Sequence, residues 1–163
     1  KSLSKRYNKN ANILGVTPLN NSGDKYSNYN DINYSNAITE LFKIFNLEFD
    51  LDKNIISGLS TDENVKQILK SKNKFDAVYI DGGHDYDTVI SDIKLVDEIL
   101  NVGGYIVTDD SSCFKDISSL PIFTGHLEVC EAIKDTLEVN PNYSEILCVG
   151  HNRIFKKLIW NMF

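Results

Sequence analysis

Long hydrophobic runs are missing from this 163-residue sequence. No apolar run approaches the roughly 20 residues that a helix needs to span a bilayer. Residues 1–6 carry charges without the apolar segment that follows such charges in a secretion signal. The sequence therefore predicts neither secretion nor membrane insertion, and we expect a cytoplasmic protein with no membrane partner.

Cysteine and net positive charge are also scarce. Cys113, Cys130 and Cys148 are too few and too widely spaced for a disulfide framework, so we expect small, mostly buried thiols in a reducing compartment. Seventeen basic residues against 23 acidic residues give a net charge of -6. This acidity argues against a nucleic-acid partner, because sequence-independent binding to phosphates requires a positive surface. A small-molecule substrate suits the composition better.

The sequence does contain a regular alternation of strand and helix patterns. Short apolar runs predict the strands, and apolar residues at helical spacing predict the helices between them. The expected strands are residues 13–16, 54–58, 75–81, 105–110, 144–149 and 153–157, the last two as an antiparallel pair. The expected helices are residues 35–45, with Ser35 as the cap, 60–69, 89–100, ended by Gly103 and Gly104, and 127–137.

The order of these elements predicts an α/β fold. Strands and helices that alternate through right-handed crossovers build a Rossmann-like, mostly parallel open sheet with helices on both faces. The length is that of one domain, so we expect a single domain over residues 1–163, with residues 1–11 and 20–34 as flexible or loop segments. The strand over residues 75–81 is almost continuously apolar, which is typical of a parallel strand buried on both faces.

Aspartates stand at the ends of two predicted strands. Asp81 closes one strand, and Asp109 and Asp110 close the next. Ligands bind at the carboxyl ends of the strands in such sheets, and three carboxylates there would suit Mg²⁺. The alternative is that these aspartates cap helices or face solvent, because aspartate is common at such turns.

His84 follows the first of these strand ends. Gly82 and Gly83 permit close approach of a ligand to the backbone, and His84 then has the chemistry of a general base or of a ligand-binding donor. A turn histidine bonded to the backbone is an equal alternative. For His126 and His151 we expect loop roles, because neither has metal-ligand spacing to a second histidine or cysteine.

Residues 75–86 and 100–110 together resemble the second half of class I S-adenosylmethionine-dependent methyltransferases, and in particular their small-molecule group. The first segment runs from an apolar strand into Asp81-Gly82-Gly83-His84, and the second runs through a glycine pair to Asp109. The resemblance covers residues 53–111 well and the rest by element order. It implies methyl transfer from S-adenosylmethionine to an oxygen or nitrogen atom of a small molecule or sugar, and it leaves open both a need for Mg²⁺ and a homo-oligomer.

The resemblance also implies roles for individual residues. His84 and Asp81 would be catalytic, with His84 as the base. The implied cofactor-binding residues are Thr17, Gly58, Ser60, Asp81, Gly82, Gly83 and His84. The implied metal ligands are Asp81, Asp109 and Asp110, which would hold Mg²⁺ against the substrate oxygens.

The sequence departs from the family on its N-terminal side. The first strand and the glycine-rich loop of the family should precede Ile13, but the residues there are polar and do not contain them. The acidic residues expected after the second and third strands fall at Thr17 and Leu59. We therefore expect a truncated or degenerate methyltransferase, with a non-catalytic binding or assembly role as the alternative. A divalent-metal hydrolase is a third hypothesis, disfavoured because no second metal-binding group is evident.

Overall fold

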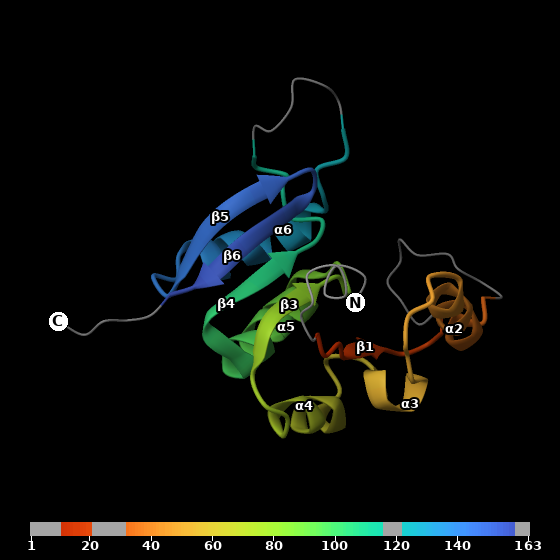
Figure 1. Ribbon diagram of the computed structural model, residues 1–163. Coiled ribbons are helices and arrows are strands. Elements are labelled where there is room, and N and C mark those ends of the chain that lie inside the picture. The colour runs from red at the N-terminus through yellow and green to blue at the C-terminus, as the bar shows by residue number, and fades with distance from the viewer. Residues whose placement is uncertain (1–10, 21–31, 116–121, 159–163) are drawn as a thin grey trace. The chain divides into compact units, whose positions relative to one another are not determined.

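The computed structural model describes residues 11–20, 32–115 and 122–158 (Figure 1). The chain divides into two compact units, residues 1–65 and residues 66–163, and each is described by itself. The single domain expected from the sequence stays a prediction, and the expected loop residues 1–10 and 21–31 lie outside the described residues. Within the described part of the chain, no helix combines the length and the apolar character needed to cross a membrane.

The first unit contains a short pair of parallel strands. β1 (Gly15–Thr17) pairs with β2 (Ile55–Ser57), and both strands are shorter than their apolar patterns predicted. The helices α2 (Tyr34–Ile44) and α3 (Leu51–Asn54) lie between them in sequence. The helix α4 (Glu63–Lys70) begins at the end of this unit and continues into the second.

The cap of α2 is Asn33 and not the predicted Ser35. The Asn33 side chain accepts a hydrogen bond from the backbone N–H of Asn36 at 2.9 Å, whereas Ser35 lies inside the first helical turn. Asparagine and serine are equally good caps, and both precede the apolar stripe of this helix. The sequence pattern alone therefore does not choose between them.

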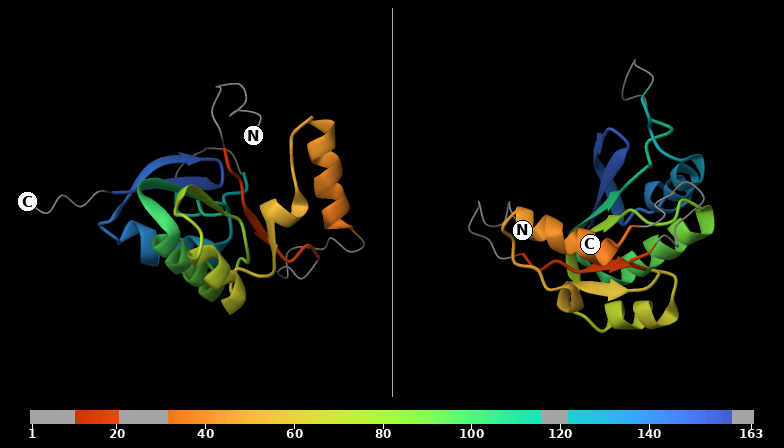
Figure 2. Two further views of the ribbon diagram at one scale, coloured as in Figure 1. Left: turned by 60° about the horizontal axis from the view of Figure 1, so that its bottom comes forward. Right: turned by 90° about the vertical axis from the view of Figure 1, so that its right-hand side faces the viewer.

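The second unit is built on a four-stranded sheet with the order β3-β4-β6-β5. The strands are β3 (Phe75–Ile80), β4 (Leu100–Thr108), β5 (Tyr143–Val149) and β6 (Asn152–Lys157). β3 and β4 are parallel, and β6 is antiparallel to both of its neighbours. The β5–β6 hairpin, drawn in blue in Figures 1 and 2, is the antiparallel pair that the sequence predicted. The α/β class is confirmed.

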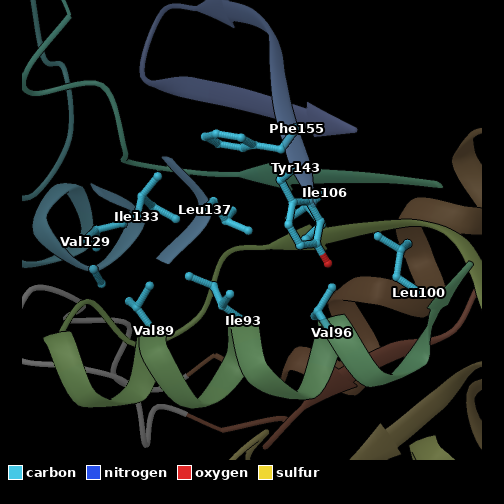
Figure 3. Close-up of a cluster of buried hydrophobic side chains, with 11 residues drawn as sticks. Val89, Ile93, Val96, Leu100, Ile106, Val129, Ile133, Leu137, Tyr143 and Phe155 are labelled. Atoms are coloured by element: carbon cyan, nitrogen blue, oxygen red, sulfur yellow. The ribbon is translucent and has the colours of Figure 1, made fainter. Parts of the chain in front are cut away.

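Two helices bury their apolar stripes against one face of this sheet. They are α5 (Tyr86–Ile99) and α6 (Leu127–Ile133), and α6 continues as a short π-helix, η1 (Lys134–Glu138). Figure 3 shows the α5 side chains pointing toward residues of α6, η1 and the sheet. The buried cluster comprises Val89, Ile93, Val96, Leu100, Ile106, Val129, Ala132, Ile133, Leu137, Tyr143 and Phe155. This core holds the ends of β3 and β4 in place.

The prediction that β3 is buried on both faces is wrong. Val78 and Ile80 pack against the core, but the intervening Tyr79 is 55% exposed. Within the second unit β3 is the edge strand and pairs with β4 alone. An apolar run predicts a strand, but it does not tell an edge strand from a central one.

The predicted helix end at Gly103 and Gly104 is also wrong. α5 ends at Ile99, and β4 starts at the next residue, Leu100. The glycines lie inside β4, where its register with β3 shifts. Gly103 has a φ of 82°, and a Cβ on Gly104 would lie 2.9 Å from the carbonyl oxygen of Asp76. Gly104 therefore permits the close approach of the two strands, whereas Gly103 supplies the left-handed backbone conformation before it.

Arg153 is the most deeply buried charged side chain among the described residues, at 1% exposure. Its Nη2 lies 2.5 Å from Glu138 Oε1 and 2.5 Å from Glu145 Oε2. Lys115 also contacts Glu145, at 2.8 Å. These four residues form an ion cluster that joins the segment after β4 to η1, β5 and β6.

Candidate active site

The carboxyl ends of β3 and β4 bring Asp81 and Asp109 together. Ile80 pairs with Thr108 in the parallel register, and the Asp109 N–H donates to the Ile80 carbonyl at 3.0 Å. The side chains of Asp81 and Asp109 lie close enough for a hydrogen bond when one of them carries a proton. The register of the sheet therefore places the two strand ends at one edge, as the sequence predicted.

The electrostatics of this edge favour a bound proton or cation. Desolvation raises the pKa of the Asp81 carboxyl, and the negative charges of Asp109 and Asp110 raise it further. Desolvation also raises the pKa of Tyr79, whose hydroxyl hydrogen-bonds to Asp109. Two carboxylates this close repel each other unless a proton or a metal ion lies between them.

Asp110 turns the chain immediately after this pair. Its φ of 49° is a left-handed conformation, which aspartate tolerates better than most residues that carry a side chain. The hydroxyls of Thr108 and Ser111 lie 2.7 Å apart on either side of the turn. Despite this turn, oxygens of the two adjacent carboxylates remain close together, because Asp109, Asp110 and His151 offer ligand atoms within 4.8 Å of one another.

His84 lies beside Asp110. The His84 Nε2 is 2.9 Å from Asp110 Oδ2, and both side chains are largely buried. The next residue, Asp85, caps α5 by accepting a hydrogen bond from the Thr88 N–H at 3.0 Å. The start of the helix therefore fixes the segment that carries His84, and the neighbouring carboxylate orients its ring.

His126 and His151, for which we expected loop roles, also reach this edge. His126 Nε2 lies 3.6 Å from Asp110 Oδ2, and His151 Nε2 lies 3.2 Å from Asp109 Oδ1. Spacing gave no hint, because the two histidines come from a loop before α6 and from the β5–β6 turn. The one sequence signal was the glycine that precedes each of them.

A small hollow with room for about one water molecule lies beside these residues in the second unit. Its polar wall is formed by residues 81–84 and Asp109, and its apolar wall includes Val129 and Ile133. The segment 82–83 has no side chains, so its main chain forms part of the wall. A ligand at the strand ends would meet backbone and carboxylate groups on one side and the core on the other.

The remaining cofactor-binding residues implied by the sequence lie in the first unit. Thr17 ends β1 and Gly58 directly follows β2, and the Gly58 N–H donates to the Thr17 carbonyl at 3.1 Å. Ser60 follows two residues later. The structure thus groups Thr17 with Gly58 in one unit and residues 81–84 with Asp109 in the other. Their common role in cofactor binding stays a prediction.

One protein family accounts for more than half of the chain. Its sequence model, described as a methyltransferase domain, matches residues 25–111. The chain belongs to this methyltransferase domain family. The match includes Asp81, His84, Asp109 and Asp110, so these residues fall within the methyltransferase domain.

A curated relative comes from a giant virus. The chain is 31% identical over 118 residues to the uncharacterized protein R132 of Acanthamoeba polyphaga mimivirus. The aligned segment covers 70% of this chain and 47% of the relative. The chain therefore spans about half the length of this relative.

Solved methyltransferases share the fold. The O-methyltransferase NovP matches 96% of this chain and 64% of its own, with a TM-score of 0.60 and 11% identity. The mycinamycin methyltransferase MycE, in complex with Mg and SAH, matches 95% of this chain and 47% of its own, with a TM-score of 0.55 and 14% identity. An O-methyltransferase from Bacillus cereus, in complex with SAH, matches 90% of this chain and 73% of its own, with a TM-score of 0.54 and 14% identity. These matches confirm the Rossmann-like methyltransferase fold.

Proposed function

We propose that this chain acts in S-adenosylmethionine-dependent methyl transfer to an oxygen or nitrogen atom of a small molecule or sugar. The observation that carries the proposal is the contact of His84 Nε2 with Asp110 Oδ2 at 2.9 Å, beside the carboxylates of Asp81 and Asp109, in a methyltransferase domain. The similar structures named O-methyltransferases favour oxygen as the acceptor. The net charge of -6 supports a substrate other than nucleic acid.

His84 is the proposed base. In its neutral form the imidazole donates Nε2–H to Asp110, so Nδ1 keeps the lone pair that takes the proton of the acceptor hydroxyl or amine. Asp110 then stabilises the imidazolium and holds the ring in one orientation, as carboxylates do beside catalytic histidines. Loss of the acceptor proton raises the nucleophilicity of the acceptor atom toward the methyl group.

The carboxylates at the strand ends fit Mg²⁺. Asp109 Oδ1 is buried and makes no hydrogen bond within the described residues, although His151 Nε2 lies 3.2 Å from it. Hard carboxylate oxygens are the ligands that Mg²⁺ prefers. Asp81, Asp109 and Asp110 are the residues that would hold the ion. A bound Mg²⁺ would supply Lewis-acid activation of the acceptor hydroxyl.

The main chain of residues 81–84 is the proposed wall for the methyl donor. A Cβ on Gly83 would lie 3.1 Å from Thr88 Cγ2, so glycine lets this segment pack closely against the start of α5. Thr17, Gly58 and Ser60 are the proposed cofactor contacts of the first unit. When bound, S-adenosylmethionine supplies a sulfonium methyl group, and the residues around it position and desolvate that group.

A non-catalytic role in binding or assembly is the second candidate. The observation in its favour is that Thr17 and Leu59 stand where the resemblance implies acidic residues, the first of which would bind the ribose hydroxyls. Leu59 is exposed and offers no polar group of its own side chain. A domain of this kind would retain the fold and lose the cofactor.

Titration of S-adenosylhomocysteine separates the two candidates. We expect binding by this chain or by the longest reading frame that contains it. With radiolabelled S-adenosylmethionine and a panel of hydroxylated sugars and catechols, His84→Gln should lower methyl transfer about 100-fold or more, since it removes the base. Asp87→Asn, an exposed acid one turn away on α5, is the matched control and should leave transfer unchanged.

Two results would contradict the proposal. If neither protein binds S-adenosylhomocysteine with or without Mg²⁺, the non-catalytic candidate replaces methyl transfer. If binding is intact and His84→Gln transfers methyl groups as fast as the wild type, the chain is a methyltransferase but His84 is not its base.

A further inference from the structure

All three histidines of the chain meet at Asp109 and Asp110. The sequence contains no others, and they come from three separate segments, after β3, before α6 and between β5 and β6. Proposed methyl transfer uses only His84. The presence of His126 and His151 at the same edge therefore calls for a second explanation.

Two of these histidines share one carboxylate oxygen. His84 Nε2 and His126 Nε2 lie 2.9 Å and 3.6 Å from the same atom, Asp110 Oδ2. One ligand atom from each of these three residues can be chosen so that all lie within 4.8 Å of one another. Ligands about 2.1 Å from a tetrahedral ion are about 3.4 Å apart. The observed separations therefore allow a common ion after small side-chain movements.

The main chain places His126 at this position. The His126 N–H donates to the Asp110 carbonyl at 3.0 Å, and Ser111 forms an antiparallel bridge with Gly125. A Cβ on Gly125 would overlap the Asp110 carbonyl group, so only glycine lets the two segments approach this closely. The geometry of His126 thus follows from backbone packing as well as from its attraction to Asp110.

The surroundings of this group are sheltered from water. The side chains of His84, Asp110 and His126 are 15%, 13% and 23% exposed. The rings of His84 and His126 lie 4.3 Å apart, and Phe123 packs edge-on against His126 with ring centroids 5.4 Å apart. Phe123 is itself 54% exposed and so covers the group only in part. Partial burial of this kind reduces solvent access to a metal bound there.

We propose that His84, His126 and Asp110 bind a divalent transition metal ion of the Zn²⁺ type in preference to Mg²⁺. Two imidazole nitrogens and one carboxylate form a ligand set of three protein groups, as in catalytic zinc sites, with the fourth position left open. Imidazole suits zinc and its neighbours, whereas Mg²⁺ requires oxygen ligands. Asp109 and His151, 3.2 Å apart, flank the ion without being its main ligands.

This site has a consequence for the proposed reaction, and that consequence rests on the proposed function. A metal on His84 Nε2 would replace the hydrogen bond to Asp110, and the ring proton would then lie on Nδ1. Neither ring nitrogen would keep a lone pair to accept the proton of the acceptor, so His84 could not act as the base. Loading with a transition metal and base catalysis by His84 therefore exclude each other. The metal site itself rests on the ligand set and is tested without any methyl donor.

The test is calorimetric titration of the chelator-treated chain with ZnCl₂ and, separately, MgCl₂. We expect one Zn²⁺ per chain, bound at least about 100-fold more tightly than Mg²⁺. His126→Gln should weaken Zn²⁺ binding roughly 10-fold or more, because even the outer partners of ligands commonly contribute that much. His151→Gln should weaken it less, and Cys113→Ser should not change it, since a thiol is not a ligand in this site.

Circular dichroism of each variant shows whether it is folded, so that a loss of metal affinity can be separated from a loss of structure. His151 is 42% exposed, so its replacement is not expected to disturb folding, and it serves as the matched histidine control. The proposal is overturned if Mg²⁺ binds as tightly as Zn²⁺ or if folded His126→Gln retains full Zn²⁺ affinity. It is equally overturned if His151→Gln loses more affinity than His126→Gln. Because the titration contains no S-adenosylmethionine, a failure here leaves the methyltransferase proposal standing.

Discussion

Arg153 is held by opposite charges and by an aromatic ring. Its guanidinium contacts Glu138 and Glu145 and lies 4.9 Å from the ring centroid of Phe155. Basic residues mostly face water, so nothing in the sequence around Arg153 indicates that it is buried. A buried arginine becomes favourable only when carboxylates from other segments converge on it, and their convergence is not visible in a linear pattern.

Arg153→Met should lower the free energy of unfolding by about 3 kcal/mol, because it leaves Glu138 and Glu145 without their buried partner. Urea denaturation followed by circular dichroism measures the loss. Lys72→Met is the control, since Lys72 is exposed and its replacement should change stability by less than about 0.5 kcal/mol. Equal effects of the two variants would show that the buried ion cluster contributes nothing.

Among the elements, β4 illustrates how tertiary contact decides what a glycine does. A glycine pair after an amphipathic pattern is a standard signal for a helix end. Here the chain leaves the helix at Leu100 and enters the strand directly. Gly104 is needed because the β3 backbone lies against it, and Gly103 because of its positive φ. The strand pairing cannot be deduced from local spacing.

Gly104→Ala should destabilise the protein by about 1–3 kcal/mol, the usual cost of overpacking a site that cannot relax. The added Cβ would lie 2.8 Å from the Asn101 carbonyl oxygen and 2.9 Å from the Asp76 carbonyl oxygen. Gly150→Asn is the control, because a Cβ at Gly150 meets nothing within 4 Å and its φ of 58° suits asparagine. Thermal unfolding of both variants checks the prediction, and a smaller loss for Gly104→Ala than for Gly150→Asn would refute it.

The sequence predicted the helices and strands better than it predicted their caps and which of their faces are buried. The apolar period placed α5 and the β5–β6 hairpin, because burial against a core produces that period directly. It misplaced the cap of α2, where Asn33 and Ser35 carry equivalent signals. It also failed for Tyr79, since an edge strand and a central strand can have the same composition.

For the molecule as a whole, the sequence predicted the aspartates and His84 of the candidate site and missed His126 and His151. Asp81 and Asp109 were predictable because neighbouring parallel strands end at one edge of a sheet. His126 and His151 were not, because a close backbone contact at Gly125 and a hairpin turn bring them there. Regular elements obey rules that sequence spacing reveals, whereas loop positions depend on contacts between distant segments.

The ion cluster around Glu145 links four segments of the second unit and should make its stability depend on pH. Burial raises the pKa of Glu145, but hydrogen bonds and charges from Arg153 and Lys115 outweigh it, so the pKa lies below its ordinary value of 4.5. A depressed carboxyl pKa stabilises the folded state at neutral pH, and this contribution is lost as the pH falls from 4.5 through the folded-state value.

The stability difference between the wild type and Glu145→Gln should therefore be constant above about pH 5 and shrink at lower pH. Urea denaturation from neutral to acidic pH measures it. Glu40→Gln, on the exposed surface of α2, is the control and should show little difference at any pH. A Glu145→Gln difference that grows as the pH falls would contradict the assigned direction of the pKa.

The left-handed backbone at Asp110 also restricts the evolution of this position. Only aspartate, asparagine and glycine adopt that conformation readily, and in the genetic code both asparagine and glycine are one nucleotide away from aspartate. Two of the single-nucleotide changes at codon 110 thus preserve the path of the chain while they remove the carboxylate. A lineage that no longer needs the chemistry can lose it here in a single step and keep an intact, well-folded domain.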